Sequence, residues 1–166
     1  MKKRNYITLG LGLIFIIFFL NAMFPAGGDK PKTEAKAFWK YIAEDNVYTD
    51  WKQWPGMEGM YEGQSPHGAF LKLYVNDKAY RAIKANEEMP DGAILVKENY
   101  GKDKKTLVAI TPMYKSEGYN PDAGDWFWAK YSMDGDVKAS GKVQSCIDCH
   151  MKVQDQEWLF TKGKGK

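Results

Sequence analysis

Residues 69–76 read AFLKLYVN, so that apolar side chains recur at every second position. Leu71, Leu73 and Val75 would lie together on one face of an extended chain. This period of two is typical of a β-strand with a buried face, whereas an amphipathic helix repeats its apolar residues every three or four positions. Three further strands are predicted at residues 93–99, 106–114 and 125–132. We therefore predict a sheet of about four strands, for which a bundle of long helices is a poor match.

Helical signals lie before, between and after these strands. Thr33 is predicted to cap a helix that buries Phe38, and Asn76 is predicted to cap another. Pro55 is expected to end a short helix, and the glycine-rich residues 56–68 are expected to form a loop. The predicted helices cover residues 33–44, 46–54, 77–89 and 154–161. This order of elements indicates an α+β fold, an antiparallel β-sheet with flanking helices.

The first 28 residues differ in character from the rest. Lys2, Lys3 and Arg4 precede an apolar run that extends from residue 7 to residue 24. Such a pattern is typical of an export signal, and a helix over residues 6–24 would measure about 28 Å, close to the bilayer core. We expect residues 1–28 to be a signal peptide or a membrane anchor, with both outcomes open, and residues 29–166 to form one domain. The positive start predicts that this domain lies in a bacterial periplasm, secreted or anchored to the inner membrane.

The charge of the predicted domain is balanced. The chain has 24 Lys and Arg residues against 21 Asp and Glu, and Lys2, Lys3 and Arg4 all precede the first acidic residue. Without those three, 21 residues of each sign remain. No basic excess is left to suggest a nucleic-acid partner.

Residues 146–150 carry the most specific chemistry in the chain. They read CIDCH, and the pattern CxxCH is the signature of covalent haem attachment. Cys146 and Cys149 would each form a thioether with one vinyl group of the haem, and His150 would bind the iron. The sequence therefore predicts one covalent haem c.

Two other interpretations of the cysteine pair compete with haem attachment. A disulfide redox pair also has the form CxxC, but it normally follows a strand of an α/β unit and needs no histidine. A structural zinc site needs four protein ligands, and the chain has only two cysteines and two histidines. Zinc would therefore have to recruit the distant His67.

The motif lies late in the chain. In common electron-transfer cytochromes, a methionine well downstream of the motif binds the iron on its other face. Here Met151 is the only methionine after His150, and an immediate neighbour cannot reach that face. We expect a five-coordinate iron with an open distal side. If His67 bound the iron instead, the site would be six-coordinate and suited to electron transfer; a distal-pocket role and a purely structural role for His67 also stay open.

Five segments carry a family resemblance when they are taken in order. They are PHG at residues 66–68, LYVN at 73–76, GAILVKE at 92–98, GDW at 124–126 and the closing CxxCH. In this order they resemble the cytochrome P-460 family, which includes the beta-type cytochromes c-prime. The resemblance covers most of the chain from about residue 51 to residue 150.

The resemblance implies a sheet-rich haem c domain, often dimeric, with His150 as the proximal iron ligand. In the enzymes that give the family its name, a strand lysine is joined covalently to the haem edge and hydroxylamine is oxidised; that lysine falls on Lys97. The beta-type relatives lack this bond and bind nitric oxide or carbon monoxide. The resemblance therefore leaves the enzyme status open.

Lys97 interrupts an apolar run and shares a predicted strand face with Leu95. A lysine that points inward tends to lose its charge, and only a neutral amine is a nucleophile. The alternative is a lysine that extends to water beside Glu98. Hydroxylamine oxidation would also need a base. Candidates for the base and for an iron-binding thioether are Glu58, Glu62, Glu117, Met57, Met60 and Met113, which we interpret first as solvated or packing residues.

The sequence thus predicts a periplasmic monohaem cytochrome c whose iron binds or oxidises hydroxylamine or nitric oxide. The alternatives are a non-catalytic nitric oxide binder or sensor, and a six-coordinate electron-transfer cytochrome. The expected partners are a small nitrogen ligand, a redox partner cytochrome and a second copy of the chain.

Overall fold

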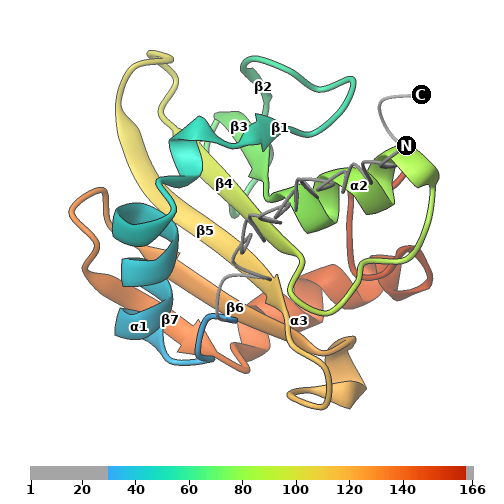
Figure 1. Cartoon of the computed structure of the whole chain (residues 1–166). Helices are drawn as coiled ribbons and strands as arrows, with labels where there is room; N and C mark the ends of the chain where they lie inside the picture. Colours follow the sequence, from blue (N-terminus) through green and yellow to red (C-terminus); the bar gives the residue numbers. More distant parts are fainter. Residues whose placement is uncertain (1–29, 164–166) are drawn as a thin grey trace, which may run out of the picture.

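The computed structural model describes residues 30–163, which form an antiparallel sheet flanked by helices (Figure 1). The seven strands run in the order β1-β3-β4-β5-β6-β7, and β2 also pairs with β3. The strands are β1 (Lys52–Gln53), β2 (Tyr61–Glu62), β3 (Phe70–Val75), β4 (Ile94–Tyr100), β5 (Leu107–Lys115), β6 (Trp126–Tyr131) and β7 (Val137–Gly141). This architecture confirms the predicted α+β class.

The helices are short. The α-helices are α1 (Ala35–Trp39), α2 (Asp77–Ala85) and α3 (Gln144–His150). A π-helical segment, η1 (Lys40–Asp45), continues α1, and the 3-10 helices are η2 (Tyr48–Asp50), η3 (Pro121–Ala123) and η4 (Met151–Gln156).

The sheet separates two buried clusters, and alternate residues of β4 belong to different ones. Leu95 belongs to the cluster that contains Trp126 and buried residues of α2 and α3, whereas Val96 belongs to the cluster that contains Phe38 of α1. This alternation follows from the two-residue period of a strand. Successive β4 side chains therefore enter different environments.

The strand register brings distant residues together on the face that carries α3. Lys97 pairs with Leu73 of β3 and with Thr111 of β5. Met113 of β5 pairs with Trp128 of β6. Paired residues of an antiparallel sheet point to the same side, so these side chains line one wall.

Local signals predicted the central elements well. The strands expected at residues 69–76, 93–99, 106–114 and 125–132 are β3, β4, β5 and β6. Asn76 caps α2, since its Oδ1 accepts the Ala79 N–H at 3.0 Å. That helix ends at Ala85, four residues earlier than expected, because Asn86 adopts a left-handed conformation with φ +57°.

The helix predicted over residues 46–54 is wrong. Val47 has φ +39°, which prevents a continuous helix, and only the single turn η2 forms after it. Lys52 and Gln53 then pair with β3 as the short strand β1. The next segment, expected to be a loop, contains the short strand β2.

The ends of the described chain also differ from the predictions. Thr33 is not the N-cap of α1; that position belongs to Glu34, with no side-chain cap. Instead of a helix over residues 154–161, η4 ends at Gln156 and the chain reverses through Glu157 and Trp158, both with positive φ. Strand β7 was not predicted, because its five residues, VKASG, contain only one large apolar side chain.

The predicted signal or anchor at residues 1–28 lies outside the described residues. Within residues 30–163, no helix has the length and apolar character needed to cross a membrane.

Candidate functional site

Helix α3 presents the CxxCH motif to a pocket. Cys146 and Cys149 are three positions apart and therefore lie on one face of the helix, and both thiols are free. Together with His150 they line a pocket of about 1030 Å³, a volume that includes its open mouth.

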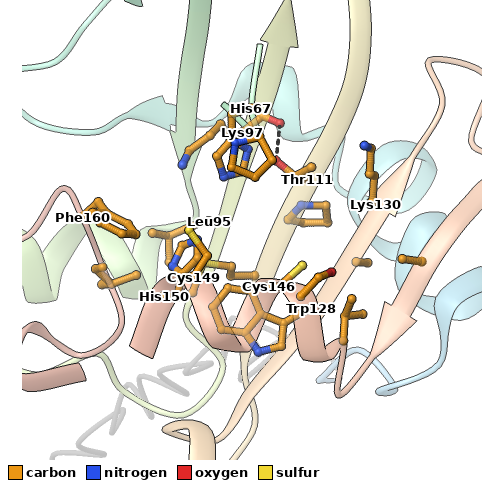
Figure 2. Close-up of a pocket in the computed structure, with 18 of the residues that line it drawn as sticks. His67, Leu95, Lys97, Thr111, Trp128, Lys130, Cys146, Cys149, His150 and Phe160 are labelled. Atoms are coloured by element: carbon orange, nitrogen blue, oxygen red, sulfur yellow. Dashed lines mark hydrogen bonds between the residues drawn. The ribbon is translucent and has the colours of Figure 1, made fainter. Parts of the chain in front are cut away.

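The pocket lies between α3, the sheet and the segment after η4 (Figure 2). Its walls are largely apolar, and large side chains come from five separate parts of the chain. The apolar wall residues include Leu73, Leu95, Met113, Trp128, Leu159 and Phe160. Two thiols and an imidazole at the edge of such a space fit a covalently bound haem. Their roles as haem-binding residues stay predictions.

His150 is buried and held by its neighbours. Its side chain is packed against the rings of Trp128 and Phe160, with ring centres 4.6 Å and 5.2 Å away. Its Nδ1 lies 2.6 Å from the carbonyl oxygen of Trp158, which only accepts hydrogen bonds. The proton must therefore sit on Nδ1, and Nε2 keeps the lone pair that binds a metal. Burial lowers the pKa of His150 to about 4, so this imidazole is neutral near pH 7.

The carbonyl that binds His150 belongs to a tightly held chain reversal. Glu157 and Trp158 have φ +57° and +66°, a conformation that costs free energy for residues other than glycine. Glu157 is fixed on two sides: its carboxylate accepts the Met89 N–H at 2.7 Å, and its carbonyl accepts the indole N–H of Trp126 at 3.0 Å. These contacts hold the reversal that aims the next carbonyl at His150.

His67 reaches the same pocket from the loop between β2 and β3 (Figure 2). Its Nδ1 lies 3.0 Å from Oδ1 of Asn99, a β4 residue whose side chain is 3% exposed. The ring centres of His67 and His150 are 6.3 Å apart, and the ring planes make an angle of 84°. Burial, followed by the charge of Lys97, lowers the pKa of His67 to about 4.

Lys97 lines the pocket on the same strand face as Leu95, as predicted. The neighbouring residue Glu98 points to the other face, where Tyr48 and Tyr100 donate hydrogen bonds of 3.0 Å and 2.7 Å to its carboxylate. Lys97 and Glu98 therefore lie on opposite faces of β4, and Lys97 is partly buried. A covalent bond between Lys97 and a haem stays a prediction.

Of the six residues considered as a base or as an iron-binding thioether, five do not line the pocket. Of the three methionines considered, only Met113 is a lining residue. None of Glu58, Glu62 and Glu117 lines the pocket, and no lining residue in the described chain is an aspartate or a glutamate. Within residues 30–163, no group of three or more His, Cys, Asp and Glu side chains is arranged to hold a metal ion. The zinc alternative thus gains no support.

Three features of the site were missed by the sequence analysis. Lys130 and Phe160 also line the pocket, and Asn99 orients His67. The two-residue period of β4 could have assigned Asn99 to the face of Lys97. No local pattern, however, indicates that the carbonyl of Trp158 meets His150.

Comparison with known protein families gives one result. The family model described as Cytochrome P460 matches residues 48–161, a range that contains every residue of the pocket. A search of curated proteins found no match.

Proposed function

From the premise that this chain belongs to the cytochrome P460 family of haem-binding cytochromes, we propose that it is a monohaem c-type cytochrome that binds small nitrogen ligands, nitric oxide above all. Cys146 and Cys149 form the thioethers, and His150 is the proximal iron ligand. The bound haem supplies an iron that takes up small ligands and exchanges one electron.

Three neighbouring residues orient His150, the proposed proximal ligand of the iron. The Trp158 carbonyl keeps the proton of His150 on Nδ1, so that Nε2 is the binding nitrogen. The aromatic rings of Trp128 and Phe160 pack on the imidazole and exclude water from it. These contacts support a fixed proximal ligand.

The composition of the pocket wall favours ligand binding over oxidation. Removing protons from hydroxylamine needs a base near the ligand. Among residues 30–163, no carboxylate lines the pocket, whereas Lys97 and Lys130 both do, and the imidazole of His67 is left as the candidate base. Nitric oxide is neutral and needs no proton acceptor to bind, so this lining suits it.

Hydroxylamine oxidation is the second candidate, and the position of Lys97 is the observation that favours it. Lys97 lines the pocket beside Thr111, its partner across β4 and β5. A bond from this lysine to the haem would make the chain an oxidoreductase of the family's enzymatic type.

One set of measurements tests both candidates on protein matured with c-type haem. We expect tryptic peptides with haem on Cys146 and Cys149, a free Lys97 peptide, binding of nitric oxide, and no turnover of hydroxylamine with an added electron acceptor. Haem on the Lys97 peptide together with turnover would select the oxidoreductase. Absence of any covalent haem would refute the whole proposal.

The setting of the protein belongs to the same proposal. We place the domain in the periplasm, secreted or anchored to the inner membrane through residues 1–28, where it exchanges electrons with a partner cytochrome and pairs with a second copy. Membrane fractionation with a C-terminal tag and light scattering of the holoprotein test these points: a cytoplasmic or monomeric protein would contradict them.

A further inference from the structure

We infer that His67 is a second protein ligand of the iron, so that an incoming nitrogen ligand must displace it. The inference rests on the proposed haem binding. It is carried by the short distance between the rings of His67 and His150, which both line the pocket, and by the contacts that hold His67 there.

The hydrogen bond to Asn99 determines which ring nitrogen of His67 is left to bind a metal. The Nδ2 group of Asn99 donates to the carbonyls of Lys97 and Ala109, each at 3.1 Å, and its Oδ1 accepts the Gly68 N–H at 3.2 Å. This network sets the orientation of the amide. Its Oδ1 therefore also faces the Nδ1 of His67, which must carry the proton. The Nε2 of His67 keeps its lone pair.

Both histidines thus have the same arrangement. Each gives its Nδ1 proton to a buried oxygen, from Asn99 for His67 and from the Trp158 main chain for His150. Histidines that bind metals almost always make such a second hydrogen bond, which fixes the ring and leaves the other nitrogen for the metal.

The spacing of the two rings fits one metal between them. Two imidazoles that bound a single metal from opposite sides, with metal–nitrogen bonds of about 2 Å, would have their ring centres roughly 6 to 6.5 Å apart. The observed distance is 6.3 Å, and rings at 84° to each other do not collide.

The loop that carries His67 is packed closely on β4. A Cβ atom at Gly68 would lie 2.5 Å from the carbonyl oxygen of Tyr100, so only glycine lets the loop approach this far. Pro66 precedes His67 and also lines the pocket. The segment is therefore built to hold His67 at a fixed place.

The test is the spin state of the ferric holoprotein near pH 7, followed by electron paramagnetic resonance and visible absorption. We expect a low-spin signal of the bis-imidazole type, and conversion to high spin in His67→Ala. Because the site is then vacated, exogenous imidazole should bind His67→Ala about tenfold more tightly or better. Met151→Ala is the matched control: Met151 is exposed beside the motif, and its loss should leave both results unchanged.

Lys97 is the rival ligand in the same pocket, and it gives the test a second arm. A high-spin wild-type protein would overturn the inference, as would a low-spin protein that turns high-spin in Lys97→Met but not in His67→Ala. If His67→Ala does not fold, His67→Met provides the same decision, because its near-infrared band should move to the position of histidine–methionine ligation. Haem binding itself is unaffected by these outcomes: a chain without covalent haem refutes the proposed function, whereas high-spin haem refutes only His67 ligation.

Discussion

Replacing Asn99 with alanine should destabilise the domain far more than its size suggests. The Asn99 side chain has five hydrogen-bond partners at 3.0–3.2 Å, His67, Gly68, Lys97, Ala109 and Thr111, and its amide can bind four of them fully at one time. At a net ~0.5–1.5 kcal/mol for each bond, the total loss has an upper range of several kcal/mol. Water that enters from the pocket can replace some of these partners. We therefore expect the free energy of unfolding to fall by about 3 kcal/mol.

The assay is urea unfolding of the holoprotein, followed by tryptophan fluorescence. Asn46→Ala is the matched control, since Asn46 makes one exposed hydrogen bond, to the Tyr41 carbonyl at 2.9 Å. Its loss should cost less than about 1 kcal/mol. The same Asn99→Ala protein should show a weakened low-spin signal, because the Nδ1 proton of His67 loses its acceptor. A cost for Asn99→Ala no larger than that of the control would refute the argument that this network supports the site.

Three further predictions concern single groups. Gly124→Ala should be more destabilising than Gly118→Ala in urea, by about 1–3 kcal/mol: both glycines have positive φ, but a Cβ at Gly124 would lie 2.6 Å from the Trp158 ring and one at Gly118 meets nothing within 4 Å. Burial raises the pKa of Tyr61 to about 12, so unfolding should release its proton and stability should fall as the pH rises from about 10 to 12. Cys149→Ser should keep a haem on one thioether, detected by intact mass.

Each of these has a clear contrary result. Equal costs for the two glycine variants would mean that the Trp158 ring moves aside freely. For Tyr61, the check is a Tyr61→Phe protein: if wild type and variant lose the same stability between those pH values, the tyrosine is not responsible. Haem-free Cys149→Ser would indicate that attachment requires both thiols.

The parts of the fold that were predicted correctly carry their information locally. Strand β3 alternates within six residues, and Asn76 stands directly before the helix that it caps. By contrast, β1 and β2 have two residues each and form only because β3 offers them partners. No period can be detected in two residues, so pairing across the sheet had to be seen in the structure.

The site divides in the same way. CxxCH is contiguous, and it predicted the three residues that the structure brings to one pocket. The role of His67 stayed open in the sequence because it depends on Asn99, which is 32 positions away, and on His150. The hydrogen bond from His150 to Trp158 depends on a main-chain oxygen, which carries no residue-specific signal.

The alternation of β4 gives the register of this strand a chemical meaning. Lys97 and Glu98 are adjacent in the chain, yet Lys97 lines the pocket of the CxxCH motif and Glu98 is bound by tyrosines on the opposite face. Because a shift by one residue exchanges the two faces of a strand, a slipped β4 would deliver a carboxylate to the pocket and an ammonium group to the aromatic cluster. Under the proposed haem binding, the charge that a ligand would meet beside the iron is thus decided by strand pairing, and an insertion or deletion of one residue between Gly92 and Lys97 is predicted to reverse it.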